Sequence, residues 1–178
     1  TLLTVVIPVY NEVKTVSTVI ERVLSLDLDL DVLVVDDGST DGTRELLAGY
    51  KADRVQIVMQ EKNMGKGAAV RTGFKHAGGE IVTIQDADLE LNPLEIPALL
   101  EPILDGSADV VYGSRFVRGW HHRTRVNAAA NRFLSFLTNV LYGTRIKDME
   151  ACYKVFRRKH LERFTLKADR FDFEPEIT

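Results

Sequence analysis

The stretch VTIQDADLE, Val82 to Glu90, joins a short apolar run to three carboxylates at every second position. The run 81–84 is typical of a buried strand, and Asp86, Asp88 and Glu90 follow its end. Like charges held this close repel one another, so a favourable interaction must offset that cost. In an extended backbone residues i and i+2 point the same way. Asp86 and Asp88 can therefore converge on one point, and Glu90 can join them if the extension continues.

Two or three converging carboxylates suit a divalent cation. Mg²⁺ and Mn²⁺ prefer oxygen ligands and take their remaining ligands from water or substrate phosphates. We therefore predict a metal site at Asp86 and Asp88, with Glu90 as a further candidate ligand. The alternative interpretation is a solvated acidic loop.

Strand and helix patterns alternate on both sides of this stretch. We expect strands at 4–9, 32–35, 55–59, 81–84 and 110–112, and helices at 16–24, 41–50, 65–76 and from 92 onward. Asp41 and Asn92 are the predicted N-caps. The alternation predicts an α/β fold, with a Rossmann-like, mostly parallel sheet and helices on both faces. After Arg115 it gives way to a long helix, at about 127–142, and a mixed tail.

Polar residues gather at the carboxyl ends of the predicted strands, where open parallel sheets bind their ligands. Asp36 and Asp37 are candidates for a second metal site, or for accepting hydrogen bonds from a nucleobase or a ribose. They also fit a plain strand-to-turn sequence. At 63–67 two glycines and Lys66 open a helix, where a phosphate can meet free backbone N–H groups.

Composition sets the broad class of the protein. The 178 residues fit one domain, and 45% hydrophobic with 28% charged residues is ordinary for a globular protein. The single cysteine, Cys152, excludes an internal disulfide and suits a reducing compartment. No signal peptide and no apolar run of about 20 residues is visible, so we expect a cytoplasmic protein.

The net charge of −3 is unevenly distributed. Residues 115–147 hold seven basic residues and no Asp or Glu, which leaves −10 on the rest of the chain. The basic block is either a solvated face or a docking surface for an anion. We expect no nucleic-acid partner.

Six segments carry a resemblance to a known family. They occur in the order VVIPVYNE (5–12), VVDDGSTDGT (34–43), NMGKGAAVRTGF (63–74), IQDADLELNP (84–93), YGSRF (112–116) and IKDMEACYKVFRR (146–158). Together they resemble the family 2 glycosyltransferases of the GT-A fold, in particular the polyprenyl-phosphate sugar transferases of the dolichyl-phosphate mannose synthase group. The resemblance implies a single catalytic domain over 1–178. Its nucleotide-sugar half is 1–114, and its acceptor half, 115–178, is cut short at the C-terminus.

For the donor side, the resemblance implies inverting transfer of a hexose from a UDP- or GDP-sugar with Mg²⁺ or Mn²⁺. The donor-binding residues that it implies are Pro8, Tyr10 and Glu12 for the nucleotide pocket, Asp36 and Asp37 for the base or ribose, and Lys66, Asp86, Ala87 and Asp88 for the metal and diphosphate. Glu90 stands where some relatives have a Gln ligand. A cation bound at Asp86 and Asp88 would stabilise the negative charge that develops on the leaving oxygen. The same cation would offset the repulsion among Asp86, Asp88 and Glu90.

For the acceptor side, the resemblance implies a polyprenyl phosphate, and Arg115 matches the Arg of the family's Ser-Arg motif. Arg132 and Ser135 lie on the predicted helix that follows and are further candidates for binding the phosphate, because arginine suits phosphate geometry. If the acceptor is instead a saccharide hydroxyl, Asp148 or Glu150 is the candidate catalytic base. Salt bridges from these two residues to nearby basic residues are an equally good interpretation. The apolar stripe of the helix at about 127–142 indicates a core helix or a peripheral contact with the cytoplasmic face of a membrane.

Three other classes of protein compete with this interpretation. A receiver domain needs a strand-end Ser or Thr and then a Lys after its aspartate, and no such pair follows at a suitable spacing. A phosphatase of the haloacid-dehalogenase type carries its Asp-x-Asp at the first strand rather than the fourth. A non-catalytic module that binds nucleotide sugars stays open.

Overall fold

The computed structural model describes residues 1–113, 136, 138–140, 143, 153–161, 166–170 and 173–177. Its strands are β1 (Leu3–Val9), β2 (Leu30–Asp36), β3 (Val55–Met59), β4 (Ile81–Ile84), β5 (Val110–Tyr112) and β6 (Lys154–Arg157). Its helices are α1 (Val16–Leu24), α2 (Thr43–Ala48), α3 (Lys66–His76), the 3₁₀ turn η1 (Pro93–Glu95), α4 (Ile96–Leu104), α6 (Arg158–Leu161) and α7 (Phe173–Ile177). The five expected strands are all present.

The described strands form one sheet in the order β3-β2-β1-β4-β6-β5. β1 lies between β2 and β4 and is parallel to both, and β2 is parallel to β3. β6 was not expected from the sequence, which indicated only a mixed tail. It enters between β4 and β5 and is antiparallel to each. The sheet is therefore mostly parallel, as predicted, with one reversed strand.

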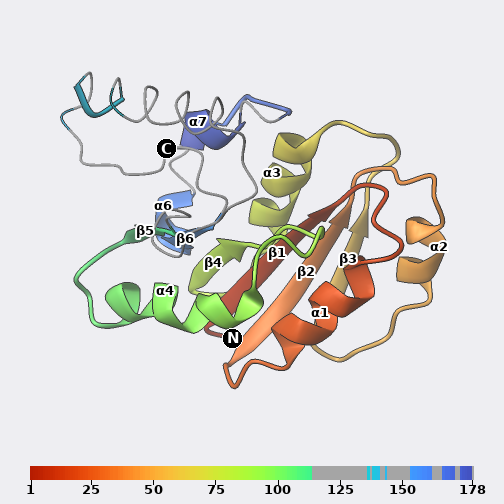
Figure 1. Cartoon of the computed structure of the whole chain (residues 1–178), viewed down its shortest axis with the longest axis horizontal. Coiled ribbons are helices and arrows are strands. Elements are labelled where there is room, and N and C mark those ends of the chain that lie inside the picture. The colour runs from red at the N-terminus through yellow and green to blue at the C-terminus, as the bar shows by residue number, and fades with distance from the viewer. Residues whose placement is uncertain are drawn as a thin grey trace.

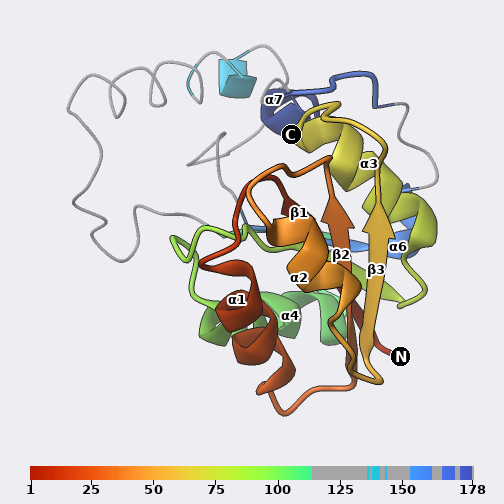
Figure 2. The ribbon, with the colours of Figure 1, turned by 90° about the vertical axis from the view of Figure 1, so that its right-hand side faces the viewer.

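Helices cover both faces of the sheet (Figures 1 and 2). On one face the apolar spacing of α1, through Val16, Val19 and Val23, packs against alternate residues of β1 and β2, beside α4. On the other face α3 packs with α7 against the remaining residues of the same strands. The strands β1, β2 and β4 are buried on both sides, which is why their sequences are nearly continuous apolar runs.

The predicted helix boundaries need one correction. α2 begins at Thr43 after Gly42, which has a left-handed φ of 99°, so Asp41 is not the N-cap. Asp41 Oδ1 instead accepts hydrogen bonds from the Thr43 N–H (3.0 Å) and hydroxyl (2.5 Å) just before the helix. The Asn92 cap is confirmed, because its Oδ1 accepts from the Leu94 N–H at 3.2 Å. Of the long helix expected at about 127–142, residues 136 and 138–140 are described and are helical.

Gly73 lets α3 approach the centre of the sheet. A Cβ added at this buried position would overlap Cγ1 of Val6 on β1. Gly73→Ala should lower the free energy of unfolding by up to about 2 kcal/mol, because overpacking costs about 1–3 kcal/mol and the helix preference of alanine returns about 1 kcal/mol. Urea denaturation measures the change.

The matched control is Gly78→Ala, since Gly78 is exposed and a Cβ there meets nothing within 4 Å. It should change the free energy of unfolding by less than about 0.5 kcal/mol. Equal effects of the two substitutions would contradict the packing argument.

Candidate active site

A cavity of about 490 Å³ opens at the carboxyl ends of β1, β2 and β4, where α3 begins. It contains eight of the predicted donor-binding residues together with five others. The lining residues are Pro8, Val9, Tyr10, Glu12, Asp37, Asn63, Gly65, Lys66, Ala69, Asp86, Ala87, Asp88 and Arg170. The polar edge expected from the strand ends is therefore a cavity whose volume lies in the range of small-molecule sites.

One wall of the cavity is the loop between β1 and α1, which carries Tyr10 and Glu12. The loop turns at Asn11, which has a left-handed φ of 58°. The Asn11 N–H donates to Ser39 Oγ at 2.9 Å, and Asn11 Oδ1 accepts from the Thr40 N–H at 2.8 Å. These bonds join the loops after β1 and β2, so Tyr10 lies on a turn that is held by hydrogen bonds and is 46% exposed.

Asp86 is paired with a lysine. Lys66 Nζ, at the first residue of α3, lies 2.7 Å from Asp86 Oδ1, and both residues line the cavity. The ammonium group partly offsets the repulsion between the neighbouring carboxylates Asp86 and Asp88. In the described structure, the Lys66 ammonium thus supplies part of the positive charge that the sequence led us to expect from a metal ion.

The backbone does not stay extended as far as Glu90. β4 ends at Ile84, and Leu89 has a left-handed φ of 64°. Asp88 Oδ1 accepts a hydrogen bond from the Glu90 N–H at 2.9 Å. The extended backbone that would bring Glu90 to the two aspartates is therefore not present. Among the described residues, no group of three or more His, Cys, Asp or Glu side chains could hold a metal.

Asp86 and Asp88 nevertheless fit a divalent ion. They supply hard oxygen ligands on one cavity, Asp86 is only 17% exposed, and Asp88 is open to solvent. Mg²⁺ and Mn²⁺ commonly take one or two protein carboxylates and complete their shell with water and phosphate. The two-carboxylate metal site stays a prediction.

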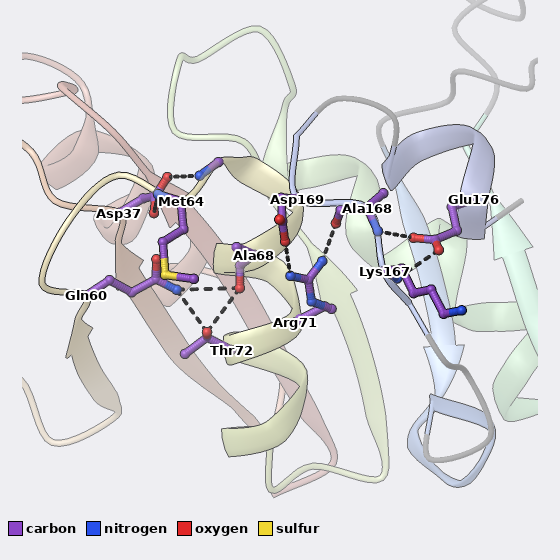
Figure 3. Close-up of polar contacts among 11 residues, drawn as sticks. Asp37, Gln60, Met64, Ala68, Arg71, Thr72, Lys167, Ala168, Asp169 and Glu176 are labelled. Atoms are coloured by element: carbon purple, nitrogen blue, oxygen red, sulfur yellow. Dashed lines mark hydrogen bonds and ion pairs between the residues drawn. The ribbon is translucent and has the colours of Figure 1, made fainter.

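Asp37 holds the protein's own backbone. Its Oδ1 and Oδ2 accept hydrogen bonds from the Met64 and Gly65 N–H groups, each at 2.8 Å, so it fastens the loop that leads into α3 (Figure 3). Burial raises the pKa of Asp37, and these two N–H donors act in the opposite direction. Asp37 lines the cavity, so its predicted contact with a base or ribose stays a prediction.

Asp36 turns into the protein instead. It is fully buried, accepts from the Ser39 N–H at 3.3 Å, and lies 3.5 Å from Arg44 Nε. It does not line the cavity. The structure therefore gives no support to a nucleotide contact or a metal at Asp36.

The segment 166–170, which we call the C-terminal strap, covers the first turn of α3. The Asp169 carbonyl accepts a hydrogen bond from the Ala68 N–H at 3.1 Å. Arg71 reaches the Ala168 carbonyl and the Asp169 carboxylate (Figure 3). A Cβ at Gly65 or Gly67 would overlap these strap carbonyls. The two glycines that the sequence linked to phosphate binding therefore also admit the strap, which takes one of the N–H groups at the helix start.

The strap brings Arg170 to the cavity, a residue that the sequence argument missed. Its position depends on Glu176 of α7, whose two carboxylate oxygens accept from the Lys167 and Ala168 N–H groups, each at 2.8 Å (Figure 3). The local sequence around Arg170 gives no signal for this role. The only hint was the glycine pair on α3, since glycine often marks a close approach of another backbone.

The predicted acceptor residues lie outside the described residues. They are Ser135, Arg115, Arg132, Asp148 and Glu150. Their assignments stay predictions. Among the described residues, no helix is both long enough and apolar enough to cross a bilayer.

Residues 4–165 match the family described as "Glycosyl transferase family 2". The chain belongs to this family. The GT-A fold expected from the resemblance is thereby confirmed, since the sheet and its flanking helices agree with the solved glycosyltransferase structures described next.

Two curated relatives and one solved structure illustrate the similarity. The chain is 36% identical to a polyprenol monophosphomannose synthase of Mycolicibacterium smegmatis, over 92% of this chain and 64% of that protein. It is 32% identical to an undecaprenyl-phosphate 4-deoxy-4-formamido-L-arabinose transferase of Aeromonas hydrophila, over 98% of this chain and 54% of that protein. The chain thus spans less than two thirds of these relatives.

The structure is similar to glucosyl-3-phosphoglycerate synthase from Mycobacterium tuberculosis in complex with Mn²⁺, UDP-glucose and phosphoglyceric acid. The TM-score is 0.73 at 25% identity, and the match covers 98% of this chain and 62% of that chain.

The Lys66–Asp86 pair predicts competition between protein and metal cations. Lys66→Met should tighten binding of Mn²⁺ alone by about fivefold, because removing a competing charge near 4 Å is worth about 1 kcal/mol in water-like surroundings. Calorimetric titration with Mn²⁺ in the absence of nucleotide measures this. The control is Lys62→Met, an exposed lysine outside the cavity lining. Unchanged or weaker Mn²⁺ binding in Lys66→Met would refute the competition.

The strap predicts a pH-dependent contribution to stability. Hydrogen bonds from the Lys167 and Ala168 N–H groups lower the pKa of Glu176. A carboxylate with a lowered pKa stabilises the fold above its unfolded pKa, and this is lost as pH falls through the folded value. Glu176→Gln should therefore lose stability relative to wild type at pH 7, and the difference should shrink below about pH 4.

Urea denaturation at several pH values measures that difference. Glu101→Gln is the control, since Glu101 is exposed on α4 and makes no side-chain hydrogen bond to the described residues. A Glu176→Gln deficit that is constant with pH would argue against an ionised clamp.

Proposed function

We propose that the chain is the catalytic domain of a glycosyltransferase that moves a hexose from a UDP- or GDP-sugar to a polyprenyl phosphate. The observation that carries the proposal is the cavity itself. Two carboxylates, Asp86 and Asp88, and two cations, Lys66 and Arg170, line one recess at the carboxyl edge of a parallel sheet. A nucleoside diphosphate needs this combination of a metal site and positive charge beside a nucleotide-sized space.

In this proposal, different residues of the chain bind different parts of the donor. Tyr10 offers an exposed ring beside Pro8, against which a nucleobase can stack. Lys66 and Arg170 place positive charge where the diphosphate would lie. A divalent ion, Mg²⁺ or Mn²⁺, held by Asp86 and Asp88 would supply charge neutralisation at the leaving diphosphate.

Lys66 has a second task in this proposal. In the described structure its ammonium lies against Asp86. When a diphosphate and a metal enter, the ammonium can turn from the carboxylate to a phosphate oxygen without leaving the cavity wall. The Asp86 carboxylate would then be available to hold a divalent ion, and the Lys66 ammonium would neutralise part of the charge of the diphosphate.

The acceptor follows from the relatives and from the basic segment 115–147. Both curated relatives are named for a polyprenol or undecaprenyl-phosphate substrate or product. We assign 1–114 to the donor and 115–178 to the acceptor, with Arg115, Arg132 and Ser135 at the acceptor phosphate. Such a lipid requires contact with a membrane, which we place on its cytoplasmic face. Phe136 and Val140 are exposed apolar residues one helical turn apart and suit that contact.

A hydroxyl acceptor is the second candidate. The similar structure from Mycobacterium tuberculosis contains phosphoglyceric acid together with its UDP-glucose. If this chain acts in that way, Asp148 or Glu150 would serve as the base that takes the hydroxyl proton.

The decisive experiment is a transfer assay with the full-length protein. Radiolabelled UDP- and GDP-sugars are offered with polyprenyl phosphate, with 3-phosphoglycerate, or with no acceptor, each with Mn²⁺ or EDTA. We expect label in the lipid fraction that requires the metal. Asp88→Asn should lower the rate at least about a hundredfold, because charge stabilisation of the leaving group is commonly worth that much.

The control for the assay is Asp53→Asn, an exposed aspartate outside the cavity lining that should leave transfer unchanged. Lipid transfer that survives both EDTA and Asp88→Asn would refute the metal-assisted mechanism. Label in phosphoglycerate alone would replace the lipid acceptor by the hydroxyl one. Nucleotide binding without any transfer would favour a non-catalytic module.

A further inference from the structure

Gln85, the residue directly before Asp86, has a fully buried polar side chain that does not line the cavity and makes its hydrogen bonds within the protein. Its Nε2 donates a hydrogen bond to the Asp86 carbonyl at 3.0 Å and a longer one to the Leu91 carbonyl at 3.4 Å. Asp86 and Leu91 are the first and last residues of the loop 86–91. One amide group therefore joins the two ends of the loop that carries the predicted metal ligands.

The remaining supports of this loop are few. Ala87 and Leu91 are buried in the apolar core on one face of the sheet. Between them Leu89 has its left-handed φ and Asp88 is exposed. The backbone of this loop is thus held by two apolar anchors and by the Gln85 amide, while Lys66 contacts the Asp86 carboxylate and the Glu90 N–H contacts that of Asp88.

Tyr153 orients that amide. It lies 68 residues further along the chain, directly before β6, and its hydroxyl donates to Gln85 Oε1 at 2.6 Å. Because the oxygen of the amide receives the hydroxyl proton, the NH₂ group must face the two loop carbonyls. Tyr153 is itself buried, and its carbonyl accepts from the Gly113 N–H at 2.9 Å. A Cβ at Gly113 would overlap the Tyr153 side chain, so the glycine makes room for it.

We propose that Gln85 and Tyr153 are positioning residues that fix the Asp86–Asp88 loop for binding of a metal and a nucleoside diphosphate. The inference rests on the function proposed above. Tyr153 follows Asp148 and Glu150 by five and three residues in the sequence. The hydrogen bond from its hydroxyl therefore joins the donor loop to a residue that is close in sequence to the candidate base residues.

The test compares three variants of the full-length protein. Tyr153→Phe removes one oxygen and leaves the amide unoriented, and Gln85→Met removes the hydrogen bonds at nearly constant volume. Gln60→Met is the matched control. Gln60 is a half-buried amide that bonds Thr72 Oγ1 at 2.9 Å and does not line the cavity.

Two quantities are measured for each variant. Calorimetry gives the affinity for UDP and GDP in the presence of Mn²⁺, and hydrogen exchange gives the protection of the amides of 86–91. We expect Tyr153→Phe to lower the affinity about three- to tenfold and Gln85→Met about ten- to a hundredfold, in line with the effect of groups that orient metal ligands. Loop exchange should accelerate in both variants and stay unchanged in Gln60→Met.

The double variant Gln85→Met/Tyr153→Phe separates positioning from simple stability. Replacing both partners of a buried hydrogen bond by apolar groups costs little stability, so the double variant should regain stability relative to the sum of the single changes. Its nucleotide affinity should stay low, because the loop ends are still unjoined. Recovery of affinity together with stability would overturn the proposal.

The remaining outcomes are also decisive. Unchanged loop exchange in Tyr153→Phe and Gln85→Met would overturn the proposal whatever the ligand. If the wild type binds neither nucleotide, but exchange of the loop amides accelerates in Tyr153→Phe and Gln85→Met as expected, the positioning role is supported and the proposed function fails. If Gln85→Met does not fold, Tyr153→Phe, which removes a single oxygen, decides the question.

Discussion

Two carboxylates stand where a fully buried strand, β4, reaches the edge of the sheet, and their mutual repulsion must be balanced by positive charge. The rest of the site is arranged around this constraint. α3 begins beside the strand end and contributes Lys66, and the C-terminal strap contributes Arg170. A charged cavity of this kind is costly without a ligand and becomes favourable when a metal and an anionic diphosphate complete it. The metal ion of the proposed function would therefore supply the positive charge that the two carboxylates require.

Several polar side chains near the cavity bind the protein's own backbone. Asp37 holds the loop before α3, Gln85 joins the ends of the loop after β4, and Glu176 holds the strap. A hydrogen bond to a charged group contributes about 1.5–3 kcal/mol, and one between neutral groups about 1 kcal/mol. Loops at the carboxyl edge have little apolar surface of their own, so these bonds can set their shape. The cavity is thus formed by backbone segments that side chains hold in place.

The sequence predicted most of the sheet correctly for a physical reason. β1, β2 and β4 are apolar runs that packing inside the sheet buries on both faces, and β3 and β5 are short, mostly apolar runs at its two edges. β6 escaped prediction because its sequence, KVFR, has only two apolar residues between two basic ones and becomes a strand by pairing between β4 and β5. The Glu90 expectation did not hold because it assumed an extended backbone that ends before Leu89.

By itself, the sequence determined the order of strands and helices and the edge at which the acidic residues gather, because hydrophobic spacing and strand ends are properties of neighbouring residues. Only the tertiary structure decided which partners those residues meet. Tyr153 reaches Gln85 across 68 residues, and Arg71 reaches Ala168 across 97. Such contacts depend on where the antiparallel strand and the strap pack on the finished sheet, and no local pattern specifies that position.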